Sequence, residues 1–381
     1  MDRTLFSSEH RAFRDAVCRF LEEEAVPFIE KWDREGAVPR EMWRKAGQLG
    51  FLCPWVEEAY GGVGADFLYS VIVIEETSRI RASGLTFGLH SDIVAPYIGN
   101  YGTEAQKKTW LPRCVTGEAI LAVAMTEPGT GSDLAGIKTN AYCDGDEWVI
   151  SGTKTFITNG NICDLVIVAA RTDLNAEPAY NGLSLFIVEA DRPGVSRGRK
   201  LEKMGLRSQD TGELAFDQVR VPGAQLLGEP GMGFFYLVQK LQQERLVCAI
   251  AAQAAAEACL APTIAYCKQR VAFGKPISAF QNTKFQLAEV ATELELGRTF
   301  VDRLIQAHTL GQEIESETSM AKWWVTEMLN RVADKCLQLH GGYGYMMEYD
   351  ICKRYMDARV FPIFAGSNEI MKVIISKRMG L

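Results

Sequence analysis

Residues Ala124–Gly136 read A-M-T-E-P-G-T-G-S-D-L-A-G and come directly after an apolar run. Three glycines in this stretch allow the backbone to approach a flat ligand closely. The hydroxyls of Thr126 and Ser132 can each donate and accept hydrogen bonds. Such a loop suits an isoalloxazine ring, whose polar edge needs donors and whose faces need apolar cover. A tight strand–turn–strand connection without a ligand is the alternative interpretation.

The spacing of the glycines argues against the common nucleotide-binding loops. A dinucleotide fingerprint that began at Gly129 would need its third glycine at position 134, which is Leu134. The chain has no G-x-x-x-x-G-K-S/T sequence, so a P-loop is excluded. The cluster Gly61–Gly64 has no strand pattern before it and is interpreted as a connection between helices. Glu127 and Asp133 are predicted to fix the loop by accepting hydrogen bonds from nearby backbone N–H groups.

A second informative block, Gln338–Asp357, reads Q-L-H-G-G-Y-G-Y-M-M-E-Y-D-I-C-K-R-Y-M-D. The helical pattern over Val325–Leu339 ends at Gly341–Gly342, which predicts a helix C-cap and a turn. His340 is interpreted as a packing or turn residue. Together the two blocks closely resemble the two signatures of the acyl-CoA dehydrogenase family, flavoenzymes that desaturate acyl-CoA thioesters.

This resemblance continues through nearly the whole chain. Three further blocks match in order: K-T-F-I-T-N-G (Lys154–Gly160), Q-R-V-A-F-G-K-P (Gln269–Pro276) and F-A-G-S-N-E-I (Phe364–Ile370). Five blocks in the same order make a chance match improbable. The chain is most similar to the long-chain acyl-CoA dehydrogenases, and the isovaleryl-CoA dehydrogenases are close by.

Composition limits the classes of protein that need consideration. The chain has 381 residues, of which 47% are hydrophobic and 23% charged, so a folded protein with a large core in two or three domains is expected. The formal net charge of −7, without a basic cluster, argues against nucleic acid as a partner. The ten cysteines include no C-x-x-C pair and no Cys/His ligand spacing. They predict buried thiols in a reducing compartment and no metal site.

Neither the N-terminal pattern nor the most apolar stretch predicts a membrane protein. The N-terminus runs directly into a helical pattern, without the features of a signal or transit peptide, and we expect a cytoplasmic protein. The stretch Leu246–Cys267 is interrupted by Gln253, Glu257 and Pro262. Its many alanines favour close helix–helix packing in water over a membrane span.

The periodicity of apolar residues changes twice along the chain. Residues 1–120 show helical periodicity, residues 121–228 show strand patterns, and residues 229–381 return to long helical patterns. The predicted strands include the apolar runs Trp148–Ile150, Leu165–Val168, Leu183–Val188 and Val219–Val221. The fold class is therefore α+β. The resemblance implies the acyl-CoA dehydrogenase fold, with an N-terminal helical domain, a middle β-barrel-like domain and a C-terminal helical bundle.

The resemblance also implies that the chain binds FAD. The positions matched to the flavin are Met125, Thr126, Ser132, Phe156, Ile157 and Thr158. Met125 and Thr126 are expected to donate hydrogen bonds to the pyrimidine side, and Thr158 is expected to lie towards N5. Phe156 stands where most relatives have tryptophan, which keeps an apolar cover and loses a donor. Read without the resemblance, Phe156 is an ordinary residue of the β-domain.

A second set of positions matches residues that reach the FAD of a neighbouring subunit: Arg270, Phe273, Gln281, Gln338, Gly341 and Gly342. An arginine supplies a permanent charge for a pyrophosphate, and a Gly-Gly turn presents N–H groups to anionic oxygens. Ser367 and Glu369 match the adenosine end. The resemblance therefore implies a shared site and a homotetramer built as a dimer of dimers. Taken alone, Arg270 is more simply explained as one half of a surface salt bridge.

The catalytic base occupies an unusual position. Many relatives carry a glutamate immediately before the glycine of the C-terminal motif, where this chain has Ala365. Long-chain and isovaleryl-type relatives place a glutamate before Arg-Leu on an earlier helix, and L-Q-Q-E-R-L puts Glu244 there. Without the family, Glu244 is interpreted as a carboxylate in the first turn of a helix or as a salt-bridge partner. The matched substrate-contacting residues are Ser132, Glu244, Arg245, Ala365 and Gly366.

The resemblance implies α,β-dehydrogenation of a medium-chain, long-chain or branched acyl-CoA to the trans-2-enoyl-CoA. Electrons would pass to an electron-transfer flavoprotein. The backbone N–H of Ala365 is expected to polarise the thioester carbonyl. One alternative is a same-fold oxidase, or a desaturase of a carrier-protein-bound or isoprenoid acyl thioester. Another is a flavin-binding homologue that has lost its base.

Overall fold

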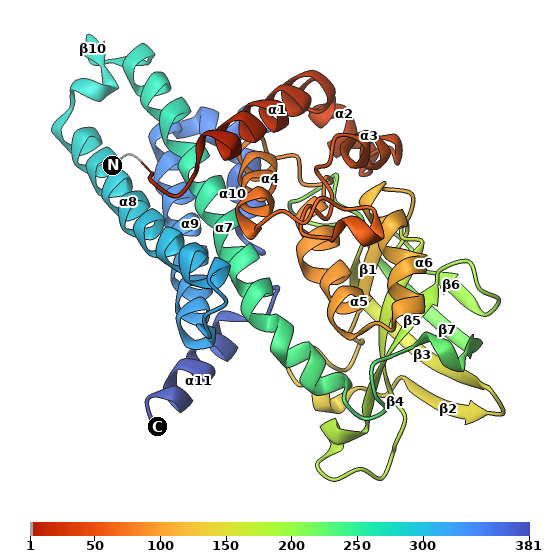
Figure 1. Ribbon diagram of the computed structural model, residues 1–381. Coiled ribbons are helices and arrows are strands. Elements are labelled where there is room, and N and C mark those ends of the chain that lie inside the picture. Colours follow the sequence, from red (N-terminus) through yellow and green to blue (C-terminus); the bar gives the residue numbers. More distant parts are fainter. Residues whose placement is uncertain (1–2) are drawn as a thin grey trace.

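Helices form the first part of the chain. The structure is a computed structural model that describes residues 3–381 (Figure 1). A capping box starts the first helix: the Ser7 hydroxyl accepts from the N–H of His10, whose ring accepts from the N–H of Ser7. The elements are α1 (Ser8–Glu24), η1 (Val26–Phe28), α2 (Ile29–Glu35), α3 (Glu41–Gln48), η2 (Glu58–Tyr60), α4 (Phe67–Arg79), the π-helical turn η3 (Leu89–Val94), α5 (Ala95–Tyr101) and α6 (Glu104–Val115).

A sheet of eight strands follows. Its order is β6-β7-β3-β2-β4-β5-β8, and β1 pairs in parallel with β4. Every residue of β5 except the last is buried, and β4 is the same, so these two apolar strands form the centre of the sheet core. The predicted apolar runs all lie in strands. The elements are β1 (Leu121–Ala124), η4 (Leu134–Gly136), β2 (Asn140–Asp144), β3 (Glu147–Thr158), β4 (Leu165–Arg171), η5 (Ala179–Gly182), β5 (Leu183–Glu189), β6 (Val195–Arg197), β7 (Thr211–Pro222), η6 (Gly223–Gln225) and β8 (Leu226–Leu227).

Long helices complete the chain. The elements are α7 (Gly233–Gln269), β9 (Val271–Ala272), β10 (Lys275–Pro276), η7 (Ile277–Ala279), α8 (Gln281–Thr309), α9 (Glu315–His340), η8 (Gly341–Tyr345), α10 (Asp350–Ala358) and α11 (Asn368–Arg378). As predicted, the pattern before the Gly-Gly pair is a helix whose C-cap is Gly341, with a φ of 59°. By length and composition alone, α7 is able to cross a membrane. However, 56% of its most apolar 18-residue stretch is buried inside the protein. It packs against α4, α8 and α9.

The three parts of the chain do not have three separate cores. Phe20 and Ile72 of the N-terminal helices share one hydrophobic cluster with Ile250 of α7 and Leu329 of α9. Figure 1 shows α4 beside α7 and α1 packed on α4, with most of the sheet at the other end of the molecule. The α–β–α order predicted from the sequence is therefore present. We propose residues 1–120, 121–228 and 229–381 as the domain limits, because the elements change type at these points.

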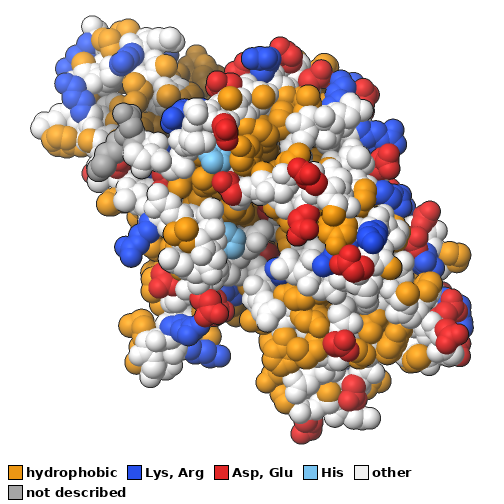
Figure 2. Space-filling view, viewed as in Figure 1, with side chains coloured by type: hydrophobic (Ala, Val, Ile, Leu, Met, Phe, Trp, Pro, Cys, Tyr) orange, Lys and Arg blue, Asp and Glu red, His pale blue; other side chains and the backbone are white. Residues whose placement is uncertain are grey.

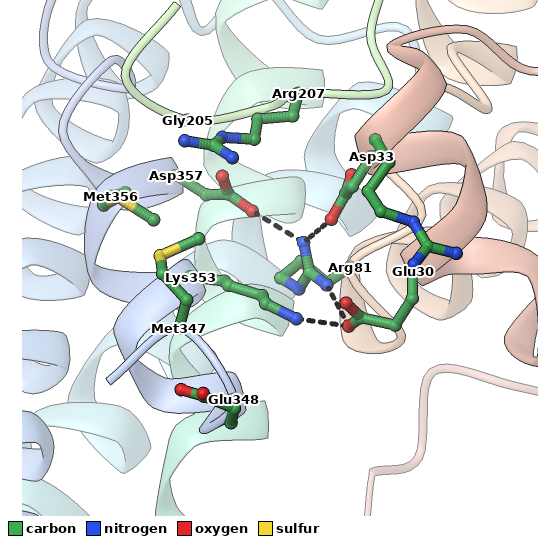
Figure 3. A pocket seen from close by; sticks show the side chains of 11 residues that line it. Glu30, Asp33, Arg81, Gly205, Arg207, Met347, Glu348, Lys353, Met356 and Asp357 are labelled. Atoms are coloured by element: carbon green, nitrogen blue, oxygen red, sulfur yellow. Dashed lines mark hydrogen bonds and ion pairs between the residues drawn. The ribbon is translucent and has the colours of Figure 1, made fainter. Parts of the chain in front are cut away.

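A charged cavity of about 520 Å³ joins the N-terminal helices to α10 (Figure 3). Arg81 lies at its centre, follows α4, and forms ion pairs with Asp33 of α2 at 2.7 Å and with Asp350 of α10 at 3.1 Å. Lys353 of α10 pairs with Glu30 of α2. None of the residues predicted to bind flavin or substrate lines this cavity. The cluster therefore ties the helical parts together, and the predicted site lies elsewhere.

Candidate active site

Glu244 lies inside α7, eleven residues after the first residue of that helix, Gly233. The residue is only 5% exposed, and its Oε1 accepts a hydrogen bond of 2.8 Å from the hydroxyl of Tyr97 on α5. Within residues 3–381, Glu244 forms no ion pair. Both alternatives suggested by the sequence, a carboxylate in the first helical turn and a salt-bridge partner, are therefore wrong.

The surroundings of Glu244 favour its neutral form more than water does. Burial raises the pKa of Glu244 to about 7, against the hydrogen bond from Tyr97 and the charges of Arg245 and Lys240, which lower it. A carboxyl group that titrates near neutral pH can take up a proton from a substrate and still be free of protons in a large fraction of molecules. Glu244 therefore has the electrostatics of a general base.

Arg245, the residue after Glu244, contacts α9. Its Nη1 donates to the Ser319 hydroxyl of α9 at 3.3 Å and lies 3.6 Å from a carboxylate oxygen of Glu315. Burial lowers the pKa of Arg245, and its Nε has no hydrogen-bond partner among the described residues. The guanidinium is thus held by α9, and the role of Arg245 in substrate binding stays a prediction.

The turn at Ala365 and Gly366 lies beside the part of α7 that carries Glu244. Both residues have positive φ, 53° and 83°. The fully buried Lys322 of α9 donates to the Gly366 carbonyl at 2.6 Å and also interacts electrostatically with Arg245 and Cys248 of α7. In the described part of the chain the N–H of Ala365 donates to no acceptor. This N–H is therefore free of protein acceptors there, and its role towards the thioester carbonyl stays a prediction.

The loop after β1 is held by a buried ion pair. The Glu127 carboxylate accepts from the N–H groups of Lys138 at 2.7 Å and Thr139 at 2.9 Å, and from Nζ of Lys154 at 2.9 Å. Lys154 also donates to the Met125 carbonyl at 3.1 Å. The predicted loop-fixing role of Glu127 is confirmed. The same role predicted for Asp133 is wrong, because its exposed carboxylate makes no hydrogen bond within residues 3–381.

We expect Lys154→Met to destabilise the fold by about 3–5 kcal/mol, because it leaves the Glu127 carboxylate buried without its counter-charge. The double variant Lys154→Met with Glu127→Gln removes both charges and should recover part of the loss. Urea unfolding monitored by circular dichroism measures both effects. A single variant as stable as wild type would contradict the structural role of the pair.

The end of β3 lies against this loop. The N–H of Thr155 donates to the Thr126 carbonyl at 3.0 Å. A register shift between Lys154 and Ile157 takes Phe156 out of the ladder, with a φ of 58° and 68% of its surface exposed. Phe156 is therefore not an ordinary residue of the sheet. Ile157 is buried in the sheet core, which leaves only its backbone for a ligand.

The residues matched to a neighbouring subunit's FAD lie far from this loop. Figure 1 shows β10 at the opposite end of the molecule from β2 and β3, and Figure 2 shows hydrophobic and basic side chains together at that end. Phe273 is 95% exposed. The Arg270 guanidinium lies 5.5 Å from the centre of the Tyr343 ring and forms no ion pair in the described chain. The salt-bridge explanation of Arg270 is therefore wrong.

Three family models cover almost the entire chain. They are the acyl-CoA dehydrogenase N-terminal domain over residues 7–118, the middle domain over 122–219 and the C-terminal domain over 231–380. The chain belongs to the acyl-CoA dehydrogenase family. Sequence and structure comparisons with individual acyl-CoA dehydrogenases support this assignment.

The long-chain specific acyl-CoA dehydrogenase of Rattus norvegicus is 48% identical over 377 residues, which is 99% of this chain and 88% of the rat protein. The isovaleryl-CoA dehydrogenase of Pongo abelii is 36% identical over 374 residues, 97% of this chain and 88% of that protein. A crystal structure of an acyl-CoA dehydrogenase from Geobacillus kaustophilus is 57% identical, with a TM-score of 0.99 and full coverage of both chains. The predicted family, fold and enzyme class are confirmed.

Acyl-CoA dehydrogenases use FAD, and the loop after β1 fits such a ligand. The N–H and hydroxyl of Thr126 and the hydroxyl of Ser132 have no hydrogen-bond partner within residues 3–381. Open space lies beside Gly129 and Gly131, where a Cβ would meet no atom within 4 Å. Thr158 accepts a hydrogen bond of 3.2 Å from Gln209. Unpaired polar groups on an open glycine loop are what a flavin edge requires.

Other residues around the acyl-CoA dehydrogenase site escaped the sequence analysis. Tyr97 hydrogen-bonds to Glu244, and Lys154 to the loop after β1. Lys322 hydrogen-bonds to the turn at Ala365 and Gly366. Lys154 stood in a matched block without a role, while Tyr97 and Lys322 stood in no block. The sequence could show only that a lysine or tyrosine stands in an apolar segment. It does not show which distant residue the side chain contacts.

Proposed function

We propose that this acyl-CoA dehydrogenase forms a trans-2-enoyl-CoA with Glu244 as its base. One observation carries the proposal: a buried carboxylate without an ion pair stands next to Arg245, on the stretch of α7 that Lys322 connects to a turn whose Ala365 N–H has no acceptor within residues 3–381. The link through Lys322 supports a common site for the base and the donor, which are 121 residues apart in the chain. Similarity to the rat long-chain enzyme supports a long-chain acyl group.

In this mechanism the chain supplies a base and an oxyanion donor. Glu244 removes the acidic proton from the α-carbon of the thioester. The Ala365 N–H donates to the thioester oxygen, where negative charge develops as the proton leaves. The hydrophobic surroundings of α7 exclude water from Glu244 and keep the carboxylate reactive. FAD, when bound, supplies the acceptor for the hydride from the β-carbon.

The rate of reduction should depend on pH with a midpoint near 7. Glu244 accepts a proton only when it is ionised, and burial raises its pKa to about 7. The second-order rate constant for flavin reduction should therefore rise between about pH 6 and pH 8 and level off above. Anaerobic stopped-flow bleaching of the flavin measures it. A rate constant that stays flat from pH 5 to pH 9 would remove Glu244 from the rate-determining proton transfer.

We also propose an electron-transfer flavoprotein as acceptor, a homotetramer as the assembly and a cytoplasmic location. A site shared between two copies is supported by the placement of the two predicted FAD-contacting groups at opposite ends of one chain, and the tetramer rests on the family resemblance. The location is supported by the ten free cysteines, eight of which are buried.

A panel of straight and branched acyl-CoAs, mixed anaerobically with the enzyme, tests the reaction and ranks the substrates. Bleaching by at least one acyl-CoA is expected. Rapid oxygen consumption without another acceptor would instead identify an oxidase. The remaining alternative is a desaturase of carrier-protein-bound or isoprenoid acyl thioesters. It would be identified if those thioesters reduce the flavin and every straight or branched acyl-CoA of the panel leaves it oxidised.

A further inference from the structure

Glu244 has a partner that the proposed mechanism does not use. The Tyr97 hydroxyl donates to Glu244 Oε1 at 2.8 Å, and neither the phenol nor the carboxylate is open to water, since Tyr97 is fully buried and Glu244 nearly so. A hydrogen bond to an ionised group is shorter and stronger than one between neutral groups, and burial strengthens it further. The bond therefore acts on both the direction and the charge of the carboxylate.

The backbone around Tyr97 is adapted to this contact. The turn that precedes α5, Leu89–Val94, is π-helical, a rare form that occurs often at functional sites. Gln243, the residue before Glu244, donates through Nε2 to the Asp92 carbonyl of this turn at 2.7 Å. Two consecutive residues of α7 are thus tied to η3 and α5 by two separate hydrogen bonds.

The remaining groups around Glu244 do not compete with Tyr97 for the carboxylate. The charges that act on Glu244 are Lys240 and Arg245, both on α7 itself. Arg245 is engaged by Ser319 and Glu315 of α9. Within residues 3–381, Glu244 forms no ion pair with a charged side chain of α4, α8, α9 or η3. Within residues 3–381, Tyr97 is therefore the side chain of a neighbouring element that hydrogen-bonds to the carboxylate and can set its orientation.

We propose that Tyr97 is a positioning residue for the base, holding the Glu244 carboxylate in its ionised form and aiming it at the α-carbon. The inference rests on the proposed role of Glu244. Tyr97 does not take the substrate proton, because Glu244 is the acceptor in their hydrogen bond when ionised. Its contribution is to lower the cost of the buried negative charge and to restrict the rotation of the carboxylate.

The test is Tyr97→Phe, which deletes one hydroxyl and keeps the ring. Loss of a hydrogen bond to the ionised form should move the pH midpoint of flavin reduction upward by about one unit. The limiting rate at high pH should fall about tenfold, while the affinity for the best acyl-CoA of the panel changes less than twofold. Anaerobic stopped-flow measurements from pH 5.5 to pH 9.5, over a range of acyl-CoA concentrations, separate the three quantities.

Tyr101→Phe is the matched control. Tyr101 lies on the same helix, and its hydroxyl donates to Gln239 at 2.8 Å instead of to Glu244. This variant should keep the wild-type midpoint. Tyr97→Gln is a second variant, because its amide can donate to the carboxylate, and it should give a midpoint between those of wild type and Tyr97→Phe. It also keeps the test open if the phenylalanine variant fails to fold.

A double variant shows whether Tyr97 acts through the base. In Glu244→Gln the carboxylate is absent, so adding Tyr97→Phe should leave the residual rate unchanged. The inference is overturned if Tyr97→Phe and Tyr97→Gln keep the wild-type midpoint and limiting rate. It is also overturned if Tyr97→Phe slows Glu244→Gln as much as it slows wild type. A wild-type flavin that no thioester reduces is a different result, which refutes the proposed function itself.

Discussion

Glu244→Gln should slow flavin reduction by about 10²- to 10⁴-fold, the range that a general base contributes. The amide cannot accept the α-proton. It can still accept the hydrogen bond from Tyr97, and it has almost the same size, so the packing of α7 should be preserved. FAD content and acyl-CoA affinity should therefore stay close to wild type. Anaerobic stopped-flow spectroscopy with the best acyl-CoA measures the rate, and equilibrium titration measures the affinity.

Glu244→Asp is the matched control for this prediction. It keeps a carboxylate and draws it back by one methylene, a displacement of about 1 Å that can cost roughly 100-fold in rate. At pH 8 the aspartate variant should therefore lie between wild type and Glu244→Gln. If Glu244→Gln bleaches at nearly the wild-type rate, another group takes the proton. Ala365 offers no carboxylate at the position that many relatives use, so that group would lie at neither of the two positions matched to a family base.

Arg270→Ala should release FAD and weaken assembly in the same variant. Within residues 3–381 the Arg270 guanidinium has no ion pair. Loss of a charge-assisted hydrogen bond of about 1.5–3 kcal/mol to FAD would weaken binding roughly 10- to 100-fold. Gln338→Ala should act in the same direction by a smaller factor. The ratio of flavin to protein absorbance after desalting measures retention, and light scattering measures the oligomer.

Arg220→Ala controls for the loss of an exposed arginine. Arg220 lies on β7, where it is half exposed and paired with Asp144 and Glu147, and it belongs to neither predicted FAD group. Its removal should leave flavin content and assembly unchanged. A wild-type protein that is monomeric and fully loaded with FAD would contradict a site shared between subunits.

The sequence alone was sufficient for the fold, the family and the cofactor. Helix ends and strands are encoded by neighbouring residues: Gly341 ends α9 because it adopts positive φ readily, and the buried run Leu165–Val168 has the composition of a central strand. Ordered blocks such as Lys154–Gly160 carry the family because many positions must match together. The proposal of Glu244 as the base also came from the sequence, from the absence of a carboxylate at 365 together with the glutamate before Arg-Leu at 244.

Only the tertiary structure decided where Glu244 lies in its helix and which side chains surround it. The sequence put it at the start of a helix, whereas α7 begins eleven residues earlier and buries it. Its partner Tyr97 is 147 residues away, and Arg81 joins α2 to α10 across an even longer separation. The physical reason is the same in each case. Burial and side-chain pairing depend on which distant segments pack together, and the pKa of a carboxyl group follows from that packing.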